Sequence, residues 1–163
     1  MTTSADQERY RALSGYVAKG VAVISTVHGR WDYATTVTDY LSVSYEPPTM
    51  LASLYGLSRM CEAIEESGRW VLSVLAEHQT YPARWLGEQG SPLVGLLDSV
   101  PHSRREPESP AIVDGCLAWF ELRTTAMHRA ATHTLFVGEV TAMGQTGDHA
   151  ARPLVRYRSG YLR

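Results

Sequence analysis

Strand-type segments outnumber helix-type segments in this chain, and the two kinds do not alternate. Apolar and β-branched runs predict strands at residues 21–27, 30–38, 50–55, 69–75, 116–127, 133–143 and 152–157. The helical spacing of apolar residues predicts only short helices, at residues 6–18, 59–66 and 80–88. A doubly wound parallel sheet would need a regular alternation of strand and helix. The pattern therefore predicts a closed or partly closed antiparallel barrel with two or three short flanking helices.

Composition and length fit one globular domain spanning residues 1–163. The chain is 44% hydrophobic and 20% charged, and 163 residues suffice to bury a core. A formal net charge of -2 and the lack of a dense basic block argue against nucleic acid as a partner. No apolar run has the length of a membrane span, and the polar first residues do not resemble a signal peptide. We therefore expect a cytoplasmic protein that binds neither nucleic acid nor membrane.

Cysteine and histidine usage predicts neither a disulfide nor a metal site. Cys61 and Cys116 are far apart and fall in different kinds of element, which favours free thiols. The histidines are scattered, and the pair His128 and His133 has no cysteine or acid at ligand spacing. The sequence also contains no recognisable hydrolytic arrangement of Ser, His and Asp. Hydrolase and metalloenzyme chemistry are therefore not expected.

A row of hydroxyl side chains is predicted on one face of the segment 36–44. Thr36, Thr38, Ser42 and Ser44 are separated by two or four residues, and even spacing places side chains on one face of an extended chain. Such a neutral row of donors and acceptors suits the edge of a polar ligand, for example a flavin ring and its ribityl chain. An edge strand with a solvated Ser/Thr face explains the same pattern, so the segment alone leaves both interpretations open.

A second candidate site lies at the start of the predicted helix 59–66. Ser58 is a suitable N-cap, and Gly68 is a suitable residue for the C-terminal end. The first N–H groups of a helix bind anions, and Arg59 adds a positive charge at that end. The pattern suits a phosphate group, and a plain cap beside a solvated arginine explains it equally well.

A third candidate is His133, which opens the predicted strand 133–143. A histidine at the start of a strand can donate a hydrogen bond to a carbonyl or amide of a ligand, but a surface histidine is the commoner case. Gly138 inside the strand predicts a bulge or the close approach of another backbone. The residues alone leave the role of His133 open.

Five segments together resemble the flavin reductase-like family, the small reductase components of two-component flavin monooxygenases. The resemblance covers nearly the whole chain, and its most characteristic part is Thr-Val-Thr at 36–38 followed by residues 41–48. The remaining matching segments are 10–13 with 20–26, 67–75 with Gln79, 133–140, and 153–155 with 157–161. Each pattern is weak alone, and the five in the family's order are specific as a set.

The resemblance implies the fold and the flavin-binding residues. It implies an antiparallel split β-barrel of Greek-key type that binds FMN or FAD. In such a protein Thr36, Val37 and Thr38 would line the isoalloxazine ring. The residues implied to lie near the ribityl chain or the phosphate are Ser42 and Ser44.

The resemblance also implies residues for the phosphate and for the nicotinamide co-substrate. Ser58 and Arg59 would hold the flavin phosphate, and Trp85 would cover the flavin. His133 would be the catalytic residue that places the nicotinamide of NADH or NADPH. Two further residues are implied to lie near it, Tyr157 and Gly160.

Two departures from the family pattern fall at these positions. The family histidine is commonly preceded by Gly-Asp, whereas Ala131 and Thr132 precede His133 here. Asp39 stands where a small neutral residue is usual, so a charge is expected near the flavin. Both departures bear on how the nicotinamide and the flavin are held.

The resemblance implies an NAD(P)H:flavin oxidoreductase that supplies reduced FMN or FAD to a partner monooxygenase. We also expect a homodimer, because a small split barrel leaves strand edges and apolar faces that a second copy can cover. Two alternatives remain at this point. One is a flavin-dependent enzyme on the same barrel that acts directly on a small organic substrate, and the other is a non-enzymatic flavin-binding module.

Overall fold

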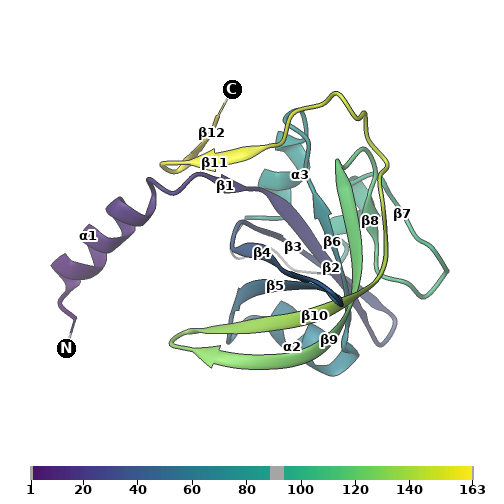
Figure 1. Cartoon of the computed structure of the whole chain (residues 1–163), viewed down its shortest axis with the longest axis horizontal. Coiled ribbons are helices and arrows are strands. Elements are labelled where there is room, and N and C mark those ends of the chain that lie inside the picture. Colours follow the sequence, from purple (N-terminus) through teal and green to yellow (C-terminus); the bar gives the residue numbers. More distant parts are fainter. Residues whose placement is uncertain (1, 89–93, 163) are drawn as a thin grey trace.

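A seven-stranded antiparallel sheet forms the centre of the computed structural model, which describes residues 2–88 and 94–162 (Figure 1). The strand order is β3-β2-β6-β9-β10-β5-β4. These strands are β2 (Ala22–His28), β3 (Trp31–Val37), β4 (Tyr40–Tyr45), β5 (Pro48–Tyr55), β6 (Arg69–Val74), β9 (Ala118–Ala130) and β10 (His133–Gly144). The predicted mainly β, antiparallel barrel is confirmed.

Short helices and two small sheets flank the barrel. One small sheet joins the two ends of the chain in the order β1-β11-β12, and the other pairs β7 with β8. Their strands are β1 (Lys19–Gly20), β7 (His102–Ser103), β8 (Ile112–Val113), β11 (Val155–Tyr157) and β12 (Gly160–Tyr161). The helices are α1 (Ser4–Ser14), α2 (Arg59–Ser67), α3 (Thr80–Trp85) and the 3-10 helix η1 (Leu96–Ser99). None of the described helices is long and apolar enough to span a membrane.

The central strands are apolar on both faces because each face packs into a different core. On β6, Trp70 and Leu72 face the interior of the barrel, whereas Val71 packs with Cys116 on the other side. On β2, Ile24 joins the barrel interior and Val23 joins the core beneath α3. The strand predicted at residues 69–75 is confirmed, and its burial on both faces explains why no polar alternation is visible there.

The sequence pattern predicts no helix or strand between residues 88 and 116 and so leaves residues 90–114 as a loop, which is wrong in the described part of this segment. Residues 94–114 contain η1, β7 and β8, and this segment buries Leu96, Leu97 and Val100 in the second core. Among the prolines and charged residues of this segment lies a short apolar run, and this run covers the outer face of β2 and β3. Residues 90–93 of this prediction lie outside the described part of the chain.

Three element boundaries also differ from the prediction. The first helix ends at Ser14 and not near Gly20, with Gly15 at its C-cap. The strand predicted at residues 152–157 is confined to β11 (Val155–Tyr157). The third helix ends at Trp85 rather than at residue 88, and its N-cap Gln79 makes no side-chain capping bond because its amide is bonded to Ala76 N and to the carbonyl of Asp114.

Gly138 lies where two strands depart from regular pairing, as predicted. The register of β9 and β10 shifts between Val137 and Gly138, which is a bulge. A Cβ added at Gly138 would lie 2.9 Å from Cζ2 of Trp70 and 3.0 Å from Cβ of Leu122, and both residues are fully buried. The glycine therefore permits a close approach of core side chains to the strand.

We expect Gly138→Ala to destabilise the protein by about 1–2 kcal/mol, because the core must shift to admit the methyl group. Urea unfolding measures this change in the free energy of unfolding. Gly160→Ala is the matched control, since an added Cβ there meets no atom closer than 3.9 Å. Equal stability of the two variants would contradict the packing described for Gly138.

A buried carboxylate ties the segment 102–113 to the central sheet. Glu121 is 3% exposed and accepts hydrogen bonds from Arg69 at 2.6 Å and from Arg105 at 3.1 Å. Burial opposes ionisation of this carboxyl, but the hydrogen bonds from both guanidinium groups outweigh it and hold the pKa of Glu121 below its usual 4.5. The ionised form is thus favoured in the folded protein.

This pKa shift predicts an acid-sensitive contribution to stability. Because the folded-state pKa of Glu121 is lowered, its contribution is complete above pH 4.5 and is lost as the pH falls below that value. Glu121→Gln should therefore lower the free energy of unfolding at neutral pH. The variant should also lose less of this free energy than the wild type when the pH is lowered into the acid range. Urea unfolding across the acid range measures this, with Glu139→Gln in an exposed ion pair as the control. A parallel shift of the whole pH profile would contradict the account.

Candidate functional site

A large cavity opens beside the edge strand β3. Its walls come from β3, the end of β5, the start of α2 and the turn after α3, and its volume is about 1180 Å³. The lining residues are 33, 35–39, 53–55, 57–60, 86–88 and 94. This volume exceeds the roughly 300–1,000 Å³ typical of small-molecule pockets. The cavity has room for more than one ring system.

The β3 wall contains Thr36, Val37 and Thr38, the three residues that the family resemblance places along the isoalloxazine ring. Within residues 2–88 and 94–162 β3 pairs only with β2, so no described strand takes up the opposite edge of its backbone. On this edge Thr36 donates its N–H to the carbonyl of Leu86 at 3.2 Å and its hydroxyl to the carbonyl of Ala83 at 2.7 Å. Its oxygen keeps only acceptor capacity for a ligand.

The other two residues of this wall contribute in different ways. The side chain of Val37 is 7% exposed and packs in the barrel core, so Val37 presents mainly backbone to the cavity. The hydroxyl of Thr38 has no hydrogen-bond partner among residues 2–88 and 94–162. Thr38 is therefore the hydroxyl of this row that can both donate to a ligand and accept from it.

The N-terminus of α2 forms the opposite end of the cavity. Ser58 caps the helix by accepting the N–H of Cys61 at 3.1 Å, and Gly68 ends it in the left-handed conformation, as predicted. The N–H groups of Arg59 and Met60 are left without helical acceptors, and both residues line the cavity. The exposed Arg59 side chain has no ion-pair partner in the described chain. This end combines helix N–H groups with a full positive charge and suits a phosphate.

The charge introduced by Asp39 is balanced within the structure. Asp39 lines the cavity and forms an ion pair with Lys19, the single lysine of the chain. The carboxylate that departs from the family pattern is thus held by a cation of β1. Glu88 is a second carboxylate on the cavity wall.

A second pocket of about 700 Å³ adjoins the first. The two share part of their walls, namely Thr36, Thr38, Gly87 and Glu88. The second pocket also contains Trp85, which the sequence assigns to the flavin, together with Tyr81, Arg84, Arg156 and Tyr161. Trp85 lines this second pocket and not the first.

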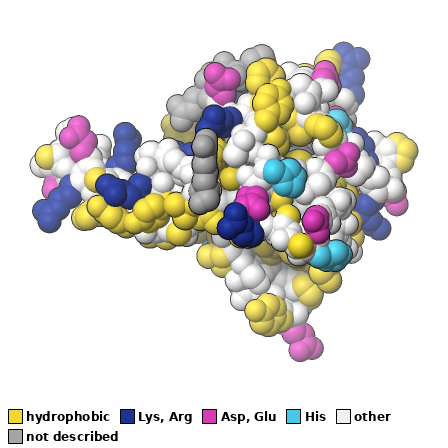
Figure 2. Space-filling view, turned by 90° about the horizontal axis from the view of Figure 1, so that it is seen from above, with side chains coloured by type: hydrophobic (Ala, Val, Ile, Leu, Met, Phe, Trp, Pro, Cys, Tyr) yellow, Lys and Arg dark blue, Asp and Glu magenta, His cyan; other side chains and the backbone are white. Residues whose placement is uncertain are grey.

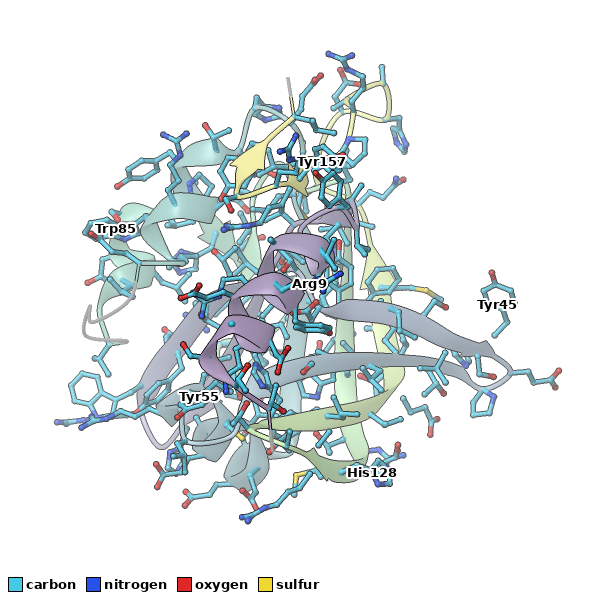
Figure 3. The ribbon with its side chains drawn as sticks, turned by 90° about the vertical axis from the view of Figure 1, so that its left-hand side faces the viewer. Arg9, Tyr45, Tyr55, Trp85, His128 and Tyr157 are labelled. Atoms are coloured by element: carbon cyan, nitrogen blue, oxygen red, sulfur yellow. The ribbon has the colours of Figure 1, made fainter. Side chains whose placement is uncertain are left out.

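The predicted continuous row of hydroxyls is wrong, because the chain leaves β3 before it reaches Ser42. β3 pairs with β2, whereas β4 pairs with β5 at the other edge of the sheet, and β4 carries a bulge between Ser42 and Ser44. Ser44 donates its hydroxyl to the carbonyl of Glu46. Neither serine lines a described pocket, and their hairpin extends away from the barrel toward Tyr45 (Figure 3).

His133 lies at the margin of the first cavity rather than in its lining. Its ring packs edge-on against Tyr55, a lining residue, with 6.0 Å between the ring centroids. Nδ1 of His133 lies 3.0 Å from the hydroxyl of Thr132. Thr132 therefore provides a polar contact to the imidazole at the position where the family commonly has an acid.

Tyr157 and Gly160 face each other in the β11–β12 hairpin. Neither lines a described pocket, but their chain neighbours Arg156 and Tyr161 line the second one. Sequence reasoning missed Arg84, Arg156 and Tyr161 as pocket residues. Their positions depend on the two-residue pairing of β1 with β11, which brings the chain ends together. A run of two residues has no periodicity that could reveal it.

Comparison with known proteins agrees with this architecture. The flavin reductase like domain model matches residues 14–163. The reductase subunit HsaB of a flavin-dependent monooxygenase from Mycobacterium tuberculosis is 28% identical over 161 residues, covering 99% of this chain and 84% of that protein. The NADH-dependent flavin reductase StyB of Pseudomonas fluorescens is 29% identical, covering 96% of this chain and 89% of that protein.

Solved structures share the fold over the same length. Nitrilotriacetate monooxygenase component B from Mycobacterium thermoresistibile superposes with a TM-score of 0.89 at 26% identity, covering 98% of this chain and 87% of that chain. The fold is thus that of the split-barrel flavin reductases. The chain belongs to the flavin reductase-like domain family, and the resemblance noted in its sequence is confirmed.

Proposed function

We propose that this protein is an NADH-dependent flavin reductase whose flavin binds in the cavity between β3 and α2. Its membership of the flavin reductase-like family and the names of its relatives support this activity. The observation that carries the location is one cavity that joins a neutral strand edge to a cationic helix N-terminus. A flavin mononucleotide has the same division into a neutral ring and an anionic phosphate.

The residues present fit this ligand. The phosphate is assigned to the free N–H groups at the start of α2 and to Arg59, and the ring to the edge of β3 with Thr38. Bound flavin supplies the hydride acceptor of the reaction. The protein needs no acid or base for hydride transfer, so its task is to bring the two rings into contact and to exclude water.

His133 is proposed to position the nicotinamide. Its ring lies beside Tyr55 at the cavity margin, and the Thr132 hydroxyl contacts Nδ1. The remaining ring nitrogen, Nε2, is then available to a carboxamide. Tyr157 and Gly160 are proposed to support this region from the β11–β12 hairpin.

The partner and the compartment are also proposals. Relatives described as reductase subunits of flavin-dependent monooxygenases favour a monooxygenase that receives the reduced flavin. NADH is the donor we favour, because the relative StyB is described as NADH-dependent. The cytoplasm, predicted from the sequence, remains the expected compartment.

We further propose a homodimer in which α1 docks on a second copy. α1 buries none of its residues and projects from the barrel as an arm (Figure 1). Hydrophobic side chains gather along one side of this arm (Figure 2): Tyr10 and Leu13 of α1 are 74% and 58% exposed, and Val17, just beyond the end of the helix, is 59% exposed. A free helix of 11 residues is marginal in water, so a partner surface would stabilise it.

Light scattering at micromolar concentration should therefore give the mass of a dimer. Leu13→Glu combined with Val17→Glu should shift the protein toward the monomer, because charges replace the exposed apolar side chains. Glu8→Gln on the same helix is a control that should stay dimeric. A wild-type protein that is monomeric at this concentration would overturn the proposal.

Steady-state oxidation of NADH tests the proposed function. We expect activity that requires added or bound flavin, with FMN and FAD compared under the same conditions and NADPH as the alternative donor. Oxidation without any flavin, or the absence of oxidation when flavin is bound, would contradict the proposed function.

A further inference from the structure

Charged side chains divide the lining of the first cavity into two parts. In the described chain three charged residues line it, namely Asp39, Arg59 and Glu88. Arg59 stands at the start of α2, the end assigned to the flavin phosphate. Asp39 follows β3, and Glu88 follows the turn after α3, so both carboxylates lie on the wall assigned to the ring. The cavity is therefore basic at its phosphate end and acidic at its ring end.

Backbone contacts fix the position of Glu88 beside β3. Thr36 donates its N–H to the carbonyl of Leu86 at 3.2 Å and its hydroxyl to the carbonyl of Ala83 at 2.7 Å. A Cβ added at Gly87 would lie 3.4 Å from Cβ of Thr36. These contacts hold the turn after α3 along the same edge of β3 that is assigned to the flavin ring. Glu88 comes directly after this turn, so its carboxylate is held on the ring side of the cavity.

The two carboxylates differ in how their charge is compensated. Asp39 forms an ion pair with Lys19. Glu88 is exposed and forms no ion pair within the described part of the chain, and residues 89–93, which follow it, contain no Lys or Arg. The two arginines of the second pocket line that pocket alone. The uncompensated charge at the ring end is therefore that of Glu88.

The proposed reaction changes the charge of the flavin ring. A hydride consists of one proton and two electrons. Its transfer from C4 of the nicotinamide to N5 of the flavin therefore leaves the nicotinamide with one positive charge and the flavin ring with one negative charge. The oxidised ring that enters the cavity is neutral. A carboxylate beside the ring thus repels the reduced flavin and has no such effect on the oxidised flavin.

We propose that the carboxylate of Glu88 lowers the affinity of the cavity for reduced flavin relative to oxidised flavin, and so favours release of the product. This inference rests on the proposed function, which supplies the flavin and the hydride donor. Glu88 acts on the ring through its charge and accepts neither proton nor hydride. The phosphate is the same in both forms of the flavin, so the ratio of the two dissociation constants reports on the ring end of the cavity.

Anaerobic titration with FMN tests this inference without NADH. The dissociation constant of oxidised FMN is measured by fluorescence, and that of dithionite-reduced FMN by equilibrium dialysis, both at pH 8. We expect wild-type protein to bind reduced FMN more weakly than oxidised FMN. Glu88→Gln should lower the ratio of the two constants, reduced over oxidised, by about fivefold. Added salt should shrink this difference between the two proteins, because Glu88 is exposed.

Two further variants separate the charge of Glu88 from its contribution to the structure. Glu88→Asp keeps the carboxylate and should keep most of the wild-type ratio. Glu65→Gln removes an exposed carboxylate of α2 that lines neither pocket, and it should leave the ratio unchanged. The midpoint potential of bound FMN should become less negative in Glu88→Gln alone, since the reduced form is then bound more tightly. A Glu88→Asp variant with the ratio of Glu88→Gln would overturn the proposal.

Failure of this inference is distinguishable from failure of the proposed function. A protein that reduces FMN with NADH but has the same ratio in wild type and in Glu88→Gln would overturn the inference and leave the function standing. Equal changes in both dissociation constants would overturn it as well, since Glu88 would then act on the shape of the cavity and not on the charge of the ring. A ratio that depends on Glu88, in a protein that oxidises no NADH, would support the effect of the carboxylate and overturn the proposed function.

Discussion

Replacing Arg59 with alanine is expected to weaken FMN binding by about 1–3 kcal/mol, the range for a hydrogen bond to a charged group. This corresponds to roughly a 5- to 150-fold increase in the dissociation constant. The reason is that Arg59 brings its charge to the cavity end where the N–H groups of α2 are free. Fluorescence titration of flavin against the two proteins measures the change.

Riboflavin is the matched control ligand for this variant, because it lacks the phosphate but keeps the ring and the ribityl chain. The affinity for riboflavin should be nearly the same in wild type and in Arg59→Ala. A second control is Arg30→Ala, since Arg30 is packed on Trp31 and does not line the cavity. Equal losses for FMN and riboflavin would mean that Arg59 does not contact the phosphate.

Replacing His133 with alanine is expected to lower kcat/KM for NADH by about tenfold while leaving the flavin dissociation constant nearly unchanged. His133 lies at the margin of the cavity against Tyr55, where it can hold the nicotinamide but not the flavin phosphate. The effect should appear as a raised KM for NADH or a slower reduction of bound flavin. Anaerobic stopped-flow reduction at several NADH concentrations separates these two effects.

His128→Ala provides the control for this prediction. His128 is exposed on β9 and outside the lining of both pockets, and it lies in the same β9–β10 hairpin (Figure 3). It should reduce flavin at the wild-type rate. If His133→Ala does the same with unchanged NADH affinity, His133 is a surface histidine and has no part in positioning the nicotinamide.

Much of the fold could be predicted from the sequence because it depends on interactions between residues close together in the chain. The helix α2 is bounded by a Ser58 cap and by Gly68, and both act through contacts within a few residues. The strand β6 is recognisable from its continuous apolar run, and this run is apolar on both faces because the strand is buried in two cores. The close packing at Gly138 was also visible, because a glycine inside an apolar strand rarely has another purpose.

The parts that sequence could not predict depend on contacts between distant segments. Even spacing places Ser42 on one face with Thr36 only if the strand is continuous, and the change of pairing partner between β3 and β4 breaks that assumption. The second pocket depends on α3 meeting the β11–β12 hairpin, whose residues are about seventy positions further along the chain. Arg84 and Arg156 therefore showed no common pattern before the structure brought them together.

Anaerobic mixing of the FMN-loaded protein with NADH tests the central claim most directly. The account predicts rapid loss of the absorbance of oxidised flavin, with a rate that saturates as the NADH concentration rises. It also predicts that Arg59→Ala reaches a similar rate once enough FMN is supplied to fill the cavity, because Arg59 binds the phosphate and takes no part in hydride transfer. Wild-type protein that binds FMN but leaves it oxidised in excess NADH would contradict the account.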